Sequence, residues 1–183
     1  MTFHFLDLDE RTRALMVVEF EDDLTSERVY VSDRLNPQGQ HEYPNLLRAA
    51  LTTYTPEWLA AQLRAGQLFN HSEPRRLPRG GMTTAQIPST AADTLAEGEF
   101  NRYYMRAICR RALEDGISQV QVYRAKAVQH ARSASQAKIG HLMPPDRLLD
   151  DLRMHQGTDT ALGLPPGPNS GLSVHLPAAP TSS

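Results

Sequence analysis

The feature that most constrains the fold is residues 90–116, TAADTLAEGEFNRYYMRAICRRALEDG, a long stretch that contains no proline. Apolar residues recur along it at helical spacing, and a glycine ends it. These signals predict the longest helix of the chain, a central helix over about residues 90–115. Gly98 is the position where this helix could bend or split in two, because glycine in a helix interior costs about 1 kcal/mol relative to alanine.

Shorter helices are predicted on both sides of the long one. TPEWLAAQLRAG carries the clearest signals, with Thr55 as the N-cap, Pro56 in the first helical position and Gly66 just past the end. The other helical segments are residues 8–24, 43–51 and 144–155, which have Asp7, Pro44 and Pro145 at or near their starts.

Short strands are predicted where β-branched or apolar residues alternate with polar ones. The three candidates are residues 27–32, 118–128 and 172–176. Residues 34–40 read as a turn, and residues 70–90 as a long irregular connection. Loops longer than about 12–15 residues are uncommon in compact domains and tend to be functional or mobile. The chain is therefore predicted to be an α+β protein that is predominantly helical.

The chain of 183 residues suits one globular domain over residues 1–160, followed by an extended arm rich in proline and glycine over residues 161–183. The net charge of -2 hides strong segregation along this domain. Residues 1–73 hold 6 Arg and 12 Asp or Glu, whereas residues 74–140 hold 11 Arg or Lys and 5 Asp or Glu. The basic part comprises the loop 74–89 and residues 90–140, and the final helix 144–155 follows it.

Three arginines of the long helix, Arg102, Arg106 and Arg110, are spaced by four residues and so form one ridge along it. We expect this ridge to face outward or sideways, opposite a broad apolar stripe. The full set of candidate partner- or anion-binding residues is Arg75, Arg76, Arg79, Arg102, Arg106, Arg110, Arg124 and Lys126. Three interpretations stay open: a solvated face with local ion pairs, a contact with nucleic-acid phosphates, or a contact with acidic surfaces of this chain or of another subunit.

The last segment of the chain divides into two parts. Residues 163–171 form a connector that the prolines stiffen and the glycines allow to turn. In the strand that follows, Leu172, Val174 and Leu176 share one face, as in a strand that adds to the edge of a sheet. We expect this strand to dock either on its own domain or on a neighbour, the alternative being a wholly disordered tail.

Residue patterns for catalysis or for metal binding are not found. One cysteine, Cys109, excludes an internal disulfide, and its helical setting predicts a small buried side chain. The 7 histidines show neither an i,i+4 pair nor an HExxH motif, and no glycine-rich segment has the lysine of a phosphate-binding loop. We therefore expect no enzyme activity, no metal and no cofactor.

The sequence favours a structural or assembly protein of a larger complex, such as a virus-like or phage particle, with other protein subunits as partners. The alternative is an accessory factor that binds nucleic acid through the arginine ridge. No apolar run approaches the ~20 residues of a membrane span, and the acidic N-terminus does not resemble a signal peptide. We expect no membrane contact and a location in the cytoplasm, or in a particle assembled there.

Overall fold

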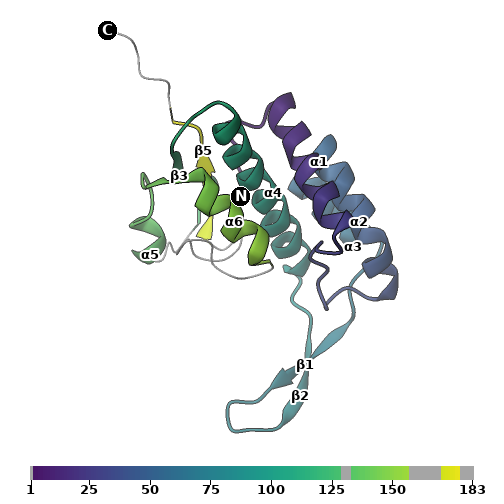
Figure 1. The fold of residues 1–183 in the computed structure, drawn as a ribbon. Coiled ribbons are helices and arrows are strands. Elements are labelled where there is room, and N and C mark those ends of the chain that lie inside the picture. The colour runs from purple at the N-terminus through teal and green to yellow at the C-terminus, as the bar shows by residue number, and fades with distance from the viewer. Residues whose placement is uncertain (1, 129–132, 157–169, 178–183) are drawn as a thin grey trace.

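A computed structural model describes residues 2–128, 133–156 and 170–177 of the chain. It has an α+β fold that is predominantly helical, as predicted (Figure 1). The helices are α1 (Glu10–Thr25), α2 (Pro37–Thr52), α3 (Pro56–Ala65), α4 (Ala91–Glu114), α5 (Ser133–Gln136) and α6 (Pro145–Met154). The strands are β1 (Ser72–Arg76), β2 (Met82–Gln86), β3 (Val120–Arg124), β4 (Leu142–Met143) and β5 (Leu172–His175).

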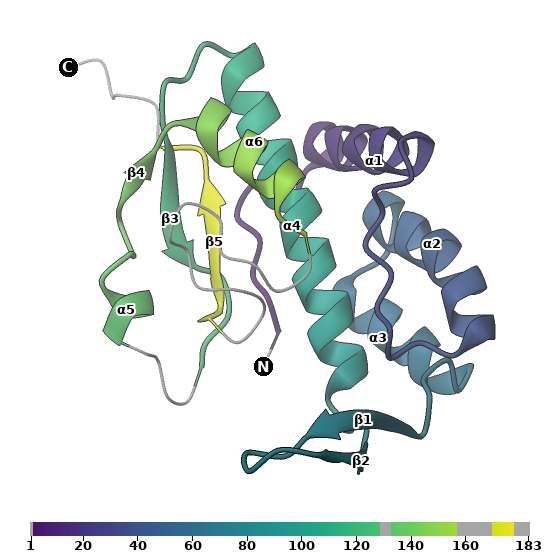
Figure 2. The ribbon, with the colours of Figure 1, turned by 60° about the horizontal axis from the view of Figure 1, so that its bottom comes forward.

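Helix α4 is the centre of the fold. It runs without interruption through Gly98, so the predicted long helix is confirmed and it does not split in two at this glycine. Helices α1, α3 and α6 pack directly against α4, and α2 packs against α1 and α3 (Figure 2). The core around α4 is made of aromatic and aliphatic side chains that are at most 1% exposed, among them Phe20, Tyr43, Phe100, Tyr103 and Tyr104.

Helix α2 begins earlier than the sequence predicted. Asn36 caps it, because the Asn36 side chain accepts a hydrogen bond from the Gly39 backbone N–H, and Pro37 takes the first helical position. The predicted turn at residues 34–40 is therefore largely the first turn of this helix. Pro44, expected near a helix start, lies inside α2.

The predicted strand at residues 27–32 does not form. Its alternating pattern is real, and Val29, Tyr30 and Val31 are partly buried against the core. A strand requires a hydrogen-bonded neighbour as well as a pattern, and no sheet of the described residues includes this segment.

The predicted irregular connection at residues 70–90 contains an antiparallel hairpin instead. Strands β1 and β2 pair in a register that joins Ser72 to Gln86 and Arg76 to Met82. Gly80 and Gly81 make the turn, with φ angles of +86° and +90° that glycine adopts readily. The hairpin extends away from the helices in both views (Figure 1 and Figure 2).

The other sheet has three antiparallel strands in the order β4-β3-β5. Strand β3 falls within the predicted residues 118–128, whereas β4 and α5 were not predicted. Gly171 allows the chain to enter β5, because its φ is +62° and a Cβ atom there would lie 2.2 Å from the Lys126 carbonyl oxygen. The sheet packs on one side of α4 (Figure 2).

Candidate functional site

The arginine ridge of α4 faces inward, contrary to the sequence prediction. Arg102 and Arg106 are only 7% and 1% exposed. Arg110 lies at the margin of the same interface, with its side chain 28% exposed. The ridge contacts α1 and α6, so the face expected to point outward or sideways is part of the helix packing.

Five residues form what we call the ion-pair cluster, in which Glu19 and Asp23 of α1 meet Arg106 and Arg110 of α4 and Arg153 of α6. The Arg106 Nε donates to a Glu19 oxygen at 2.8 Å, and its Nη2 donates to Asp23 at 3.1 Å. The Arg153 Nε donates to Glu19 at 3.0 Å, and the Arg110 Nη1 donates to Glu19 at 3.2 Å. The acidic and basic parts of the sequence therefore meet within one chain.

The cluster favours the charged forms of Glu19 and Arg106 despite their burial. Burial alone would raise the pKa of Glu19, but hydrogen bonds from Arg153 and the charge of Arg106 hold that pKa below its usual value. Burial likewise opposes the charge of Arg106, and the hydrogen bonds and negative charge of Asp23 raise its pKa instead. The cluster is a set of charges that hold three helices together.

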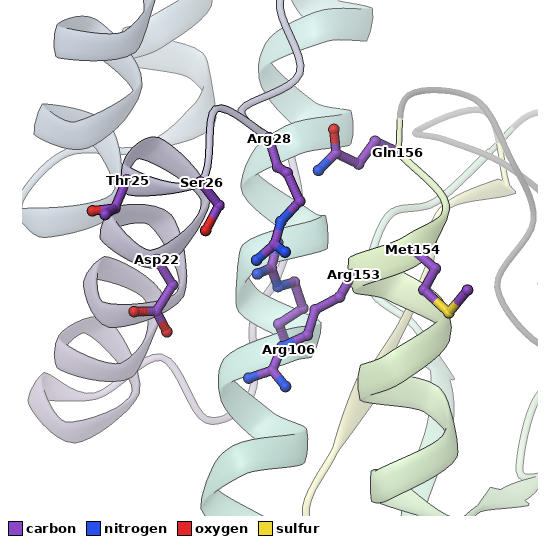
Figure 3. A pocket seen from close by; sticks show the side chains of 8 residues that line it. All are labelled: Asp22, Thr25, Ser26, Arg28, Arg106, Arg153, Met154 and Gln156. Atoms are coloured by element: carbon purple, nitrogen blue, oxygen red, sulfur yellow. The ribbon is translucent and has the colours of Figure 1, made fainter.

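A pocket of about 790 Å³ opens beside this cluster, between the C-terminal ends of α1 and α6 (Figure 3). Its lining residues are Asp22, Thr25, Ser26, Arg28, Arg106, Arg153, Met154 and Gln156. The Nε, Nη1 and Nη2 atoms of the Arg106 guanidinium already donate hydrogen bonds to Glu19 or Asp23. Two helix C-termini and Asp22 add negative charge that offsets the guanidinium groups. We therefore do not assign an anion to this pocket.

Arg124 and Lys126, the candidate cations after the long helix, also serve the fold. The Arg124 guanidinium donates to the Ser170 carbonyl at 2.9 Å and to the Gln136 side chain at 3.1 Å. The Lys126 ammonium binds Glu97 of α4 at 2.5 Å. Both side chains stabilise the sheet and its approach to α4.

The predicted docking strand pairs with its own chain. Strand β5 lies beside β3, with Val122 opposite Val174. Leu172 and Val174 are 3% and 0% exposed, and Leu176 is partly buried against the core. Most of the predicted connector, residues 163–169, and residues 178–183 of the arm lie outside the described residues.

The hairpin holds the three remaining predicted cations, Arg75, Arg76 and Arg79, which are exposed. Within the described residues, none of these three forms an ion pair, unlike the arginines of the cluster. An ion pair connects the base of the hairpin to the rest of the protein: Arg34 binds Glu73 of β1 at 2.6 Å and lowers the pKa of the Glu73 carboxyl.

Two apolar side chains stand exposed among these arginines. Leu77 is 45% exposed at the turn, and Met82 is 66% exposed at the start of β2. The sequence prediction did not include Leu77 or Met82 among the site residues, although both lie beside the arginines in the segment RRLPRGGM. The hairpin thus presents an apolar and basic surface to solvent, and we take it as the candidate functional site.

Metal ligands, the cysteine and the apolar length of the helices can be stated for the part of the chain that the structure describes. No group of three or more His, Cys, Asp or Glu residues within it could hold a metal ion. Cys109 is fully buried, as predicted, and burial raises the pKa of its thiol. Among the described residues, no helix is both long and apolar enough to cross a bilayer.

Comparison with known proteins yields no relative: no family model, no curated protein and no solved structure matches this chain.

Proposed function

We propose that this protein is a subunit of a larger protein assembly and that hairpin β1–β2 is its docking arm. The observation that supports the proposal is the exposure of Leu77 and Met82 on a structure that extends away from the core. Burying a large apolar side chain contributes about 1.5–3 kcal/mol, so a partner that covers these two would gain appreciable binding energy.

The hairpin also has physical reasons to need a partner. A two-stranded hairpin is marginally stable by itself in water, and this one has almost no buried side chain of its own. Each of its strands leaves one edge without a pairing strand among the described residues. Such edges are places where another chain can add or pack.

The segregated charges and the C-terminal strand, from which the sequence predicted an assembly protein, do not support the proposal. The charges of the cluster are matched within the chain, and β5 completes the chain's own sheet. The proposal therefore depends on the hairpin. A particle of virus-like or phage type remains the class of assembly that we propose, because such particles repeat one contact between many subunits.

Binding of nucleic acid is the second candidate function, and the same hairpin favours it. Arg75, Arg76 and Arg79 are exposed and form no ion pair among the described residues. A two-stranded β-ribbon fits the major groove of DNA, and free arginines contact phosphates and guanine edges. The ridge arginines Arg102 and Arg106 no longer support this alternative, because they are buried.

Two variants separate the proposals. Replacing Leu77 and Met82 by serine removes the apolar surface, and replacing Arg75, Arg76 and Arg79 by glutamine removes the charge. A docking arm predicts that the serine variant fails to enter high-mass complexes in the native host, as measured by sedimentation. A nucleic-acid function predicts that the glutamine variant alone loses salt-dependent DNA or RNA binding.

The matched control for the serine variant replaces Leu113 and Leu142, which are 46% and 50% exposed on the body of the protein. This control should enter complexes normally. If the hairpin serine variant also enters them normally, the docking-arm proposal is wrong.

A further inference from the structure

We propose that the partner of the hairpin is a second copy of this chain, and that the hairpin docks in a groove between α1 and α2. This inference depends on the proposed function, because it names the surface that receives the docking arm. It makes the assembly a head-to-tail arrangement of identical subunits.

We call this site the α1–α2 groove, a hollow of about 630 Å³ that is mainly apolar. Its lining residues are Leu8, Asp9, Glu10, Arg13, Ala14, Val17 and Thr52. Ala14 is exposed and Val17 is half-buried, although they lie next to Leu15 and Met16 of the core, which are 9% and 0% exposed. Val18, one turn beyond Ala14, is 41% exposed and extends the apolar face.

The apolar part of the groove matches the apolar part of the hairpin. Leu77 and Met82 are flexible side chains of medium size, and methionine in particular adapts to irregular gaps. Ala14 leaves room above α1, because its side chain ends at Cβ. Covering these side chains together would remove apolar surface of both copies from water, which is the main driving force of protein association.

The groove also offers one carboxylate to the basic hairpin. Asp9 and Glu10 stand at the end of the groove; Asp9 already binds Arg111 of α4 at 2.6 Å, whereas Glu10 forms no ion pair within the described residues. Arg13, the cation of the groove, donates to the Leu51 and Tyr54 carbonyls near the C-terminal end of α2. Exposed ion pairs contribute little to affinity, so we assign them to orientation and to the rate of association.

The two surfaces lie at opposite ends of the molecule. The N-terminal end of α1, with the groove beside it, is far from the hairpin in both views (Figure 1 and Figure 2). One copy cannot insert its own hairpin there. A contact between two different surfaces of identical subunits is heterologous, and it builds a ring where the rotation closes and a filament where it does not.

The test uses two variants that each block one side of the contact. The hairpin variant has Leu77→Asp and Met82→Asp, and the groove variant has Ala14→Arg. The purified full-length wild-type protein should form oligomers whose mass in sedimentation velocity grows with concentration. Each variant alone should stay monomeric, with self-association weakened about tenfold or more.

Mixing the two variants gives the sharper measurement. The groove of the hairpin variant and the hairpin of the groove variant are both intact, so the mixture should form a one-to-one dimer that grows no further. Unchanged circular dichroism and thermal unfolding of each variant show that the loss is local, since Leu77, Met82 and Ala14 are exposed.

Three other results are informative. If the hairpin variant loses assembly while the groove variant keeps it, the partner surface is not the α1–α2 groove, and this inference is wrong while the proposed function stands. If both variants assemble like the wild type, the proposed function is wrong as well. If wild-type protein stays monomeric and only DNA binding depends on the hairpin, the nucleic-acid alternative replaces both.

Disulfide trapping gives an independent measurement. A chain with both Arg79→Cys and Ala14→Cys should form a ladder of cross-linked oligomers under oxidising conditions. Chains with either substitution alone are the controls and should give no ladder. The native Cys109 does not interfere, because it is buried. The absence of a ladder from the double variant would contradict the proposed contact.

Discussion

Arg106 of α4 and Glu19 of α1 are 87 residues apart in sequence, yet the Arg106 Nε donates a hydrogen bond to Glu19 at 2.8 Å. Their side chains are 1% and 0% exposed, so this pair is inside the protein. The pair joins the acidic and the basic parts of the chain, so charges that are segregated along the sequence come together in the fold.

Replacing Arg106 by leucine should lower the free energy of unfolding by about 3–5 kcal/mol, because Glu19 and Asp23 would remain buried without their main partner. Urea denaturation measures this change. The control is Arg48→Gln, which removes the exposed ion pair with Glu21 and should cost about 0–1 kcal/mol. Equal effects of the two substitutions would show that the cluster does not hold the helices together.

The stability of the protein should fall as pH rises from about 4.5 to about 7, through the contribution of Glu99. Burial is the main cause that raises the pKa of Glu99 to about 7, against a usual value of 4.5. The folded state thus binds this proton more tightly than the unfolded state, and the stabilisation present at acid pH is lost as Glu99 ionises.

Glu99→Gln isolates this contribution. The free energy of unfolding of the variant, relative to the wild type, should increase by up to about 3 kcal/mol between pH 4.5 and pH 8. Denaturation at several pH values measures the difference between the two proteins. A difference that is constant with pH would show that folding does not raise the pKa of Glu99.

Gly171→Ala should destabilise the protein by about 2–4 kcal/mol, because a Cβ atom there lies 2.2 Å from the Lys126 carbonyl and the φ of +62° disfavours a side chain. The matched control is Gly116→Ala. Gly116 has a similar φ of +68° and no atom within 4 Å of the added Cβ, so it should cost only about 1–2 kcal/mol. Thermal unfolding measures the stability of both variants. A similar loss of stability at both positions would mean that the backbone near Gly171 shifts to relieve the contact with the Lys126 carbonyl.

Truncation after Gly163 should destabilise the whole fold, because it removes β5 and exposes the core to water. Leu172 and Val174 are buried, and each should contribute about 1.5–3 kcal/mol. Truncation after Pro177 keeps β5 and is the control, which should unfold like the full chain. Cooperative unfolding of the shorter chain at an unchanged temperature would contradict the assignment of β5 to the core.

The candidate site could be predicted only in part. The arginines of the hairpin, Arg75, Arg76 and Arg79, were identified from the charge of the loop, whereas Leu77 and Met82 were not. The hairpin itself was missed because it has no buried face. Alternation of apolar and polar residues appears only where one face of a strand packs on a core, and both faces of β1 and β2 are largely exposed.

Local signals in the sequence determined helices α3 and α4. The Thr55 cap and Pro56 start α3 through contacts between residues that are close in sequence. Helix α4 likewise forms along a stretch that contains no proline to interrupt it. Tertiary structure decided which face of α4 is buried. The spacing of Arg102, Arg106 and Arg110 is the same whether the ridge faces water or protein, and only the distant Glu19 and Asp23 make an inward ridge stable. Tertiary structure also decided which alternating segments became strands, because a strand needs a partner that supplies hydrogen bonds. Strand β3 finds that partner in β5, far along the chain, whereas residues 27–32 are in no sheet of the described residues.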